Sequence, residues 1–334
     1  MSPPPTMYEA LVVLLATLEA TARAGRVGDG LSWGYQALDE LTGGLHPGEV
    51  TLVAGPSSVG KTSLALQVAV HVALEAVRDA EHDTTDQEGR APGSAARGGR
   101  VWVWSLEMTL TQLVSRLLSA ETAIALDTIR RSALSVDQWV TLTDVSVWMA
   151  SLPLWLETSP HLTVAQLRHQ VASCPSPPGD TCTSSSHDPR RPGLVVVDSM
   201  AQMALQGGED REQSAADVVR GLKAMAKDMG LAVLLLSPLP ARPGARSRHR
   251  VDLQDLGAVG HVADNVLVVA SSPRPGHWAC DERLVRLEVI KQRHGPTGVA
   301  RLRWQPICGR LLDLESDDRD AIEPAPAPGH DPGP

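Results

Sequence analysis

The stretch Gly55-Pro56-Ser57-Ser58-Val59-Gly60-Lys61-Thr62 indicates the fold class, because it matches the pattern GxxxxGK(S/T) at every defined position. It lies between a β-rich run, Val50 to Ala54, and a long helical pattern, Thr62 to Val77, which is the strand–loop–helix setting that the pattern requires. In such a loop the glycines turn backbone N–H groups toward phosphate oxygens, and the N-terminus of the helix adds its dipole. Together with Ser63, this stretch is the predicted phosphate-binding site.

Two side chains of this loop carry the chemistry of nucleotide binding. We expect Lys61 to reach the β and γ phosphates of ATP, and the Thr62 hydroxyl is an oxygen ligand of the kind that Mg²⁺ takes. A Gly-rich turn with an incidental lysine is the alternative. The chain has only four Lys among its 30 basic residues, which argues against a chance match.

The composition of the 334-residue chain is that of one large core with extensions. A formal net charge of −9 does not exclude nucleic-acid binding, because phosphate contacts need only a local positive surface. The four Cys show no CxxC spacing, which predicts neither a zinc site nor a disulfide framework and favours a reducing, cytoplasmic location. The apolar run Leu11 to Leu18 lacks a positive flank, and no stretch is long enough to span a bilayer, so we expect no signal peptide and no membrane contact.

Strand and helix patterns alternate along the chain, which predicts an α/β fold with a mostly parallel sheet flanked by helices. Further strands are expected at 101–105, 152–156, 194–198, 232–237 and 265–270, and helices at 111–123, 136–150, 164–172 and 212–229. The runs 283–290, 299–304 and 310–314 follow without helices between them and predict an antiparallel C-terminal extension of the sheet.

Three units are expected along the chain. Residues 1–30 form a tail with an apolar helix at Tyr8 to Ala24, residues 31–314 form the compact domain, and residues 315–334 form a disordered, acidic, Pro-rich tail. Two polar segments within the domain, 79–99 and 175–192, are expected to be solvated inserts.

Two carboxylates are predicted to join the phosphate-binding loop. Asp198 ends the apolar run 194–198, as a magnesium-holding carboxylate does, although a strand-end Asp that faces solvent has the same pattern. Glu107 follows the strand 101–105 and would lie at the same carboxyl edge, where open α/β sheets bind ligands. It can orient and deprotonate an attacking water; a Glu that binds backbone N–H groups at a helix start is the alternative.

The order of these motifs resembles the RecA-like motor domain of DnaB-type hexameric helicases. The resemblance rests on residues 34–45, Ser105-Leu106-Glu107-Met108, Arg116-Leu117-Leu118-Ser119, residues 222–227 and, above all, Lys291-Gln292-Arg293-His294-Gly295-Pro296-Thr297-Gly298. It extends in one order over roughly residues 8 to 314. It implies a homo-hexamer or other ring that hydrolyses ATP with Mg²⁺ at subunit interfaces and moves on single-stranded DNA, with an unidentified loader or primase.

The resemblance also implies roles for three further segments. Lys291 and Arg293 would be fingers that reach the γ-phosphate held by the next subunit, where added positive charge is worth about 10³- to 10⁵-fold in rate; a solvated strand edge is the alternative. The helix at Tyr8 to Ala24 resembles the linker helix that docks on the adjacent motor domain, or else packs on its own core. Arg242, Arg246, Arg248 and Arg250 suit a DNA-tracking loop, or else a solvated basic loop.

The chain departs from the family pattern at several positions. Pro238 stands where the family has a Gln thought to sense the γ-phosphate, and proline has no side-chain amide. Gly260-His261 replaces a Glu-Gln pair, and the run Asp198-Ser199-Met200-Ala201-Gln202 differs from the usual Asp-Tyr-Leu-Gln. The family's N-terminal domain, which gathers primase, is not recognised in these residues. ATP binding is therefore a firmer expectation than the coupling of hydrolysis to DNA movement.

Three functions follow from these observations. The first is a DnaB-type translocase that separates duplex DNA, favoured by Glu107 and by the Lys291 and Arg293 pair. The second is an ATP-switched assembly protein of the RecA, RadA or KaiC kind without processive unwinding, favoured by Pro238. The third is an accessory subunit that binds ATP and regulates a full-length helicase, against which the intact loop and Glu107 argue.

Overall fold

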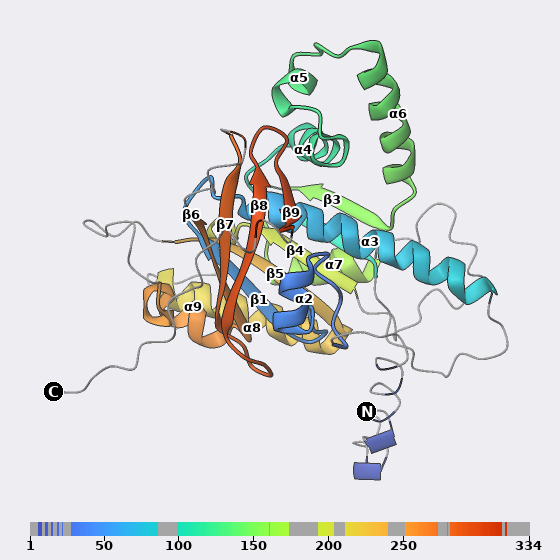
Figure 1. The fold of residues 1–334 in the computed structure, drawn as a ribbon. Coiled ribbons are helices and arrows are strands. Elements are labelled where there is room, and N and C mark those ends of the chain that lie inside the picture. The colour runs from blue at the N-terminus through green and yellow to red at the C-terminus, as the bar shows by residue number, and fades with distance from the viewer. Residues whose placement is uncertain are drawn as a thin grey trace.

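The computed structural model describes residues 28–85, 99–159, 161–173, 193–203, 211–239, 251–272, 279, 281–315 and 318, together with a few residues between 6 and 22. In this part of the chain, nine strands form one sheet in the order β3-β2-β4-β5-β1-β6-β7-β8-β9 (Figure 1). The strands are β1 (Val50–Gly55), β2 (Val101–Ser105), β3 (Leu154–Thr158), β4 (Gly193–Asp198), β5 (Leu231–Pro238), β6 (Asn265–Ser272), β7 (Arg283–Lys291), β8 (Gly298–Gln305) and β9 (Arg310–Asp313). Strands β1 to β6 pair in parallel, and β7, β8 and β9 add antiparallel to β6.

Helices cover both faces of the sheet. One face carries α2 (Gln36–Thr42), α3 (Lys61–Thr85) and α4 (Leu110–Thr122), and the other carries α7 (Val164–Ser173), α8 (Arg211–Met229) and α9 (Gly257–Val262) (Figure 1). Every residue of β1, β2 and β4 is buried. Such strands are continuous apolar runs because each successive side chain enters one of two covered faces.

The two faces differ in the side chains that fill them. Val101 and Val103 of β2 join the core beneath α3, whereas Trp102 and Trp104 alternate with them and pack in the core beneath α8. The Trp102 ring stacks on Trp155 of β3 with the ring centroids 5.5 Å apart. With no Phe in the chain, tryptophan supplies much of the large apolar surface of this core.

Helices α4, α5 (Leu126–Arg130) and α6 (Val136–Ala150) form a projection above the sheet (Figure 1). Helix α6 begins at a capping box, in which the Ser135 hydroxyl accepts from the Gln138 amide and the Gln138 side chain accepts from the Ser135 amide. None of its residues is buried. Its exposed apolar side chains are Val136, Trp139, Val140 and Val147.

The predicted fold class is confirmed, with a parallel sheet, helices on both faces and an antiparallel C-terminal extension. Helix α3 runs to Thr85, so the first seven residues of the segment expected as an insert, 79–85, are helical. The third strand begins at Leu154 rather than at residue 152, directly after Pro153, which has no N–H for a sheet ladder. Helix α2 was not predicted, and it ends at Gly43 with φ +71°.

Several expectations fall outside the described residues. The insert 175–192 and all of the tail except Glu315 and Asp318 are among them, so the domain boundaries stay predictions. Of the predicted N-terminal helix, the described residues are helical and exposed: Tyr8, Leu11, Val12, Leu15, Glu19 and Ala22. Among the helices that are described, none combines the length and apolar character needed to cross a membrane.

Candidate nucleotide-binding site

The predicted nucleotide-binding residues meet at the carboxyl edge of the parallel strands. In the register of the sheet, Ser105 at the end of β2 pairs with Asp198 at the end of β4, and Gly55 at the end of β1 pairs with Pro238 at the end of β5. Parallel strands with crossover helices bring these ends together because each strand starts again at the opposite edge. Segments that are far apart in sequence thus lie at one edge.

The loop after β1 has the backbone that a phosphate cradle requires. Ser58 and Gly60 have φ angles of +62° and +97°, which glycine adopts without strain and other residues rarely adopt. A Cβ at Gly60 would lie 3.4 Å from the Trp304 ring. The loop therefore lies against β8 on one side, and Pro56, Ser57 and Ser58 are exposed.

Lys61 begins helix α3 and folds back over the loop. Its ammonium donates to the carbonyl oxygens of Gly55 at 2.8 Å and Pro56 at 2.7 Å. Burial lowers the pKa of Lys61, while the carboxylates of Asp198 and Glu107 act in the opposite direction. A cation that is only partly hydrated, at the mouth of an N–H-lined loop, is suited to exchange these carbonyls for phosphate oxygens.

Thr62 and Asp198 are in direct contact. The Thr62 hydroxyl donates to Asp198 Oδ2 at 2.7 Å, and only 7% of Asp198 is exposed. Burial raises the pKa of Asp198, and the Thr62 hydrogen bond opposes this rise. Asp198 makes no salt bridge to any described side chain. A hydroxyl and a buried carboxylate are the hard oxygen donors that Mg²⁺ takes, so the residues present fit that ion.

Glu107 lies beside these groups and is held by a residue that the sequence did not indicate. The Ser199 hydroxyl lies 2.8 Å from Glu107 Oε1 and 2.6 Å from Gln202 Oε1. The turn before Glu107 is fixed as well, because the Leu106 amide donates to the Asp198 carbonyl at 2.6 Å. Ser199 directly follows Asp198 in sequence, but only the pairing of β2 with β4 brings it to Glu107.

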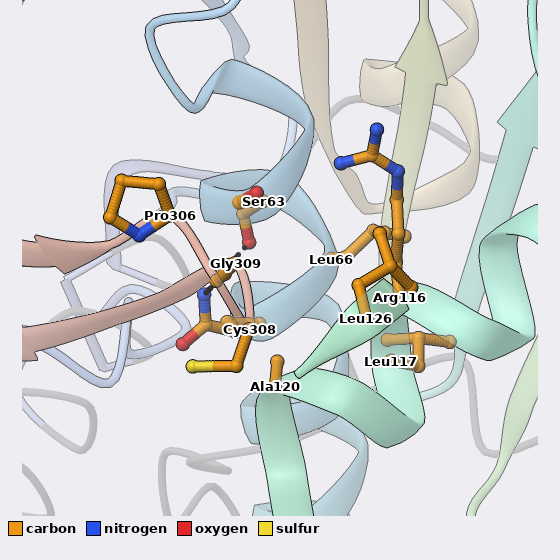
Figure 2. Close-up of a pocket in the computed structure, with 10 residues that line it drawn as sticks. Ser63, Leu66, Arg116, Leu117, Ala120, Leu126, Pro306, Cys308 and Gly309 are labelled. Atoms are coloured by element: carbon orange, nitrogen blue, oxygen red, sulfur yellow. Dashed lines mark hydrogen bonds between the residues drawn. The ribbon is translucent and has the colours of Figure 1, made fainter. Parts of the chain in front are cut away.

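A small pocket adjoins the phosphate-binding loop (Figure 2). It is lined by Ser63 and Gln67 of α3, by residues of α4 that include Arg116, and by the turn between β8 and β9 with Cys308 and Gly309. Gln67 joins these parts, because its side chain donates to the Gly309 carbonyl and accepts from the Leu311 amide, both at 3.1 Å. In Figure 2 the guanidinium of Arg116 points away from Cys308. Arg116 lies near enough to Asp198 to oppose the rise in its pKa.

Lys291 and Arg293 lie at the opposite edge of the sheet from the loop, where the parallel strands β1 and β6 begin. Arg293 donates to Asp264 Oδ1 at 2.6 Å, and Asp264 Oδ2 accepts from the amide of Val50, the first residue of β1. The phosphate-binding loop follows the last residue of that six-residue strand, so about 17 Å, at roughly 3.3 Å per residue, separates the two edges. The Lys291 ammonium donates to the carbonyls of Gly260, His261 and Ala263 at the end of α9.

The structure describes some of the remaining predicted positions and not others. Pro238 is exposed beside the loop, and the Leu239 amide donates to the Gly55 carbonyl at 3.1 Å. Gly260 and His261 lie in α9, at the edge with Lys291, rather than near Lys61. The predicted DNA-contacting residues, Arg242, Arg246, Arg248 and Arg250, lie outside the described residues.

Known proteins with similar sequences indicate the family of the chain. Residues 30–313 match the family described as "DnaB-like helicase C terminal domain". The chain is 28% identical to the replicative DNA helicase DnaB of Leifsonia xyli subsp. xyli over 92% of this chain and 61% of that protein. It is 25% identical to DnaB of Geobacillus stearothermophilus over 86% of this chain and 57% of that protein. The chain thus spans less than two thirds of the length of these curated relatives.

Two solved structures have the same fold at 21% sequence identity. One is described as an ATPase domain; it has a TM-score of 0.75 and matches over 94% of this chain and 100% of that one. The other, a DnaB-like replicative helicase solved for its interactions with primase, has a TM-score of 0.71 and matches over 94% of this chain and 68% of that one. With the family match extending over residues 30–313, the chain belongs to the DnaB-like helicase C-terminal domain family.

Proposed function

We propose that the protein is an ATP-hydrolysing, ring-forming translocase on single-stranded DNA, of the DnaB type. The observation that carries this proposal is the placement of the phosphate-binding loop and of Arg293 at opposite ends of the same strand, β1. A side chain cannot bridge that distance within one copy. A head-to-tail arrangement would bring the basic edge of one copy to the loop of the next, and repetition of that contact closes a ring.

Each residue at the carboxyl edge has a proposed role. Lys61 binds the β and γ phosphates of ATP, and the loop amides cradle them. Thr62 and Asp198 hold Mg²⁺, which would neutralise phosphate charge when bound. Glu107 orients the attacking water and accepts its proton. Ser199 fixes the carboxylate of Glu107, and Ser63 borders the pocket next to the phosphates.

The basic edge would act on the neighbouring copy. Arg293 is half-exposed, with 52% of its side chain accessible, so its guanidinium is available to a neighbour. Lys291 donates to backbone carbonyls of α9 and would supply a second positive charge. Developing charge on the transferred phosphoryl group is the target of such fingers.

The partners of the whole assembly are proposals as well. The Arg-rich loop after β5 would contact the DNA backbone, and the N-terminal helix would dock on the adjacent copy. The exposed apolar residues Leu11, Val12 and Leu15 suit that docking. One structural relative was solved for its interactions with primase, so primase is a candidate partner here. A cytoplasmic location, with DNA and ATP at hand, agrees with this function.

One observation favours the second function, an ATP-switched assembly without processive unwinding. Pro238 lies in register with Gly55, directly beside the loop, and presents no hydrogen-bond donor there. A ring with this residue would bind and hydrolyse ATP but transmit its γ-phosphate state less directly to the loop after β5.

The test is steady-state ATP hydrolysis against protein concentration, with and without single-stranded DNA. Glu107→Gln is the blank, and it should keep ATP binding with turnover about 10²- to 10⁴-fold lower, whereas Lys61→Ala should lose both. Turnover that rises with assembly and with DNA supports the translocase. Turnover that rises with assembly and ignores DNA favours the ATP-switched assembly, and turnover independent of concentration contradicts a site shared between copies.

A further inference from the structure

We infer that Asp264 is a positioning residue, which holds the guanidinium of Arg293 in place for the nucleotide site of the neighbouring copy. The inference rests on the proposed function, because it assigns a role to the basic edge of the sheet. Asp264 lies between α9 and β6, and its side chain is only 1% exposed. Arg293, which follows β7, is bonded to it at 2.6 Å and is half-exposed.

Asp264 is itself fixed from two further sides. Lys223 of α8 donates to the same oxygen as Arg293, Oδ1, at 2.6 Å, and the Val50 amide donates to Oδ2 at 3.1 Å. Desolvation alone would raise the pKa of Asp264, but the bonds from Lys223, Val50 and Arg293 outweigh it and hold that pKa below its ordinary value. The carboxylate therefore stays ionised and ties together β1, α8 and the residue after β7.

The pattern of contacts leaves the outer part of Arg293 available. One terminal nitrogen of the guanidinium binds Asp264, and the Arg293 amide donates to Asn265 Oδ1 at 3.2 Å. Within the described residues, its other guanidinium nitrogens have no hydrogen bond. Because the guanidinium is planar and rigid, a bond from one nitrogen to Asp264 keeps the other N–H donors directed away from that carboxylate.

The cluster around Asp264 also contains more cations than carboxylates. One carboxylate, Asp264, serves two cations, Lys223 and Arg293. The Lys291 ammonium is close to all three: burial lowers its pKa, Asp264 raises it, and the two cations lower it further. Glu49 adds a second carboxylate, bonded to the Asn265 side chain, so at this sheet edge Lys223, Lys291 and Arg293 outnumber the carboxylates of the described cluster by one. Such an edge attracts the polyphosphate of a neighbouring copy, and its fixed geometry reduces the entropy lost on docking.

The experiment uses Asp264→Asn, which keeps the shape and an acceptor for the Val50 amide but removes the charge. We expect unchanged ATP binding and turnover about 10- to 100-fold lower, because a misplacement of roughly 1 Å costs that much. The double variant Asp264→Asn with Arg293→Ala should be no slower than Arg293→Ala alone. Full turnover in Asp264→Asn, or a double variant that is further impaired, overturns the inference.

Mixing experiments separate a positioning role from a structural one. Lys61→Ala subunits have an intact basic edge, so in a one-to-one mixture with Asp264→Asn roughly a quarter of the interfaces pair an intact loop with an intact edge. Turnover above the mean of the two separate variants is expected. Lys61→Ala mixed with Arg293→Ala is the reference: recovery there without recovery for Asp264→Asn overturns the role of Asp264, and no recovery in the reference contradicts the shared site itself.

Two controls keep the result independent of folding. Glu75→Gln removes another buried carboxylate bonded to an arginine, Arg78, on helix α3 and away from both edges; its turnover per folded subunit should match the wild type. If Asp264→Asn fails to fold, Asp264→Asn combined with Lys223→Met removes both charges and leaves no unpaired buried cation. The same loss and the same recovery on mixing are expected of it, and their absence overturns the inference.

Discussion

Among single residues, Ser199 is the side chain whose role the structure changes most. In sequence it is the residue after Asp198, at a position where the family usually has tyrosine. In the fold its hydroxyl is 2.8 Å from Glu107 and 2.6 Å from Gln202. A short hydroxyl side chain thus links the end of the strand with Asp198 to the proposed general base, which lies just after the neighbouring strand β2.

Ser199→Ala tests this link. Without the hydroxyl, Glu107 can adopt other rotamers, so we expect turnover to fall about tenfold while ATP binding stays unchanged, since orientation rather than affinity is lost. Initial rates and equilibrium ATP binding measure the two quantities. Ser115→Ala is the matched control, because within the described residues Ser115 on α4 donates to the Thr111 carbonyl of its own helix and to no other group. Equal turnover of the Ser199 variant and the wild type would show that the Ser199 hydroxyl is not needed to orient Glu107.

Asp264 gives a prediction for stability as a function of pH. Its pKa in the folded chain lies below its ordinary value of 3.8, so its contribution to the free energy of unfolding is present above about pH 4 and disappears as pH falls through the folded-state pKa. The charged groups bonded to it are Lys223 and Arg293, Lys291 is close by, and Glu49 belongs to the same cluster through Asn265; all four are present in both proteins compared. Chemical unfolding of wild type and Asp264→Asn at several pH values should therefore give a difference that shrinks toward low pH. A constant difference contradicts the prediction.

Among the elements, the unit formed by β1, the phosphate-binding loop and α3 owes its shape to Gly60. Its φ of +97° is unfavourable for any residue with a Cβ, whereas a Cβ there would make ordinary van der Waals contact with the Trp304 ring, at 3.4 Å. The backbone conformation, rather than a lack of space, therefore favours glycine at this position. Helix α3 starts directly after it, with the Leu64 amide donating to the Gly60 carbonyl at 2.8 Å.

Gly60→Ala should therefore lower the free energy of unfolding by about 1–3 kcal/mol, the usual cost of such a backbone conformation. ATP binding should weaken as well, because the loop amides shift. Chemical unfolding and equilibrium ATP binding are the measurements. Gly48→Ala, with φ +82° and the Lys227 side chain, at 3.7 Å, as the nearest described neighbour of the added Cβ, is the control for stability loss without an effect on binding. Unaltered binding in Gly60→Ala would argue against the cradle.

Across the molecule as a whole, the two ends of the parallel strands carry different groups, so the domain has two unlike sides. One edge has the phosphate-binding loop, and the other has Asp264, Lys291 and Arg293. In the proposed function, such domains associate head to tail rather than face to face. The exposed apolar residues of the N-terminal helix and of α6 are further surfaces that a ring can bury.

Leu11→Ser combined with Leu15→Ser tests the docking of the N-terminal helix. Both side chains are exposed, at 47% and 60%, so we expect little change in the stability of the single copy. Assembly should weaken, which raises the protein concentration needed for half-maximal turnover. Sedimentation and the concentration dependence of turnover measure this. A loss of single-copy stability with unchanged assembly would mean that the helix packs on its own domain.

The amino-acid sequence alone was enough to predict the α/β class, the strand, glycine turn and helix around residues 50–77, and the order of the strands along the chain. These features are local: a strand, a glycine turn and a helix start are encoded by neighbouring residues and by hydrophobic periodicity. The strand predictions at 101–105, 194–198 and 265–270 agree with β2, β4 and β6 to within two residues at each end. The boundaries at 79 and 152 were less accurate because polar helix ends and edge strands lack a strong pattern.

Which distant residues meet depends on the three-dimensional arrangement of the strands. The pairing of β2 with β4 brings Ser199 to Glu107, and the return of β7 beside β6 brings Arg293 to Asp264. These pairs are 92 and 29 positions apart in the chain, and neither separation matches a helix or strand period that would predict the contact. Strand order and direction set such contacts, and they follow from burying both faces of the whole sheet at once, a property that no short stretch of sequence contains.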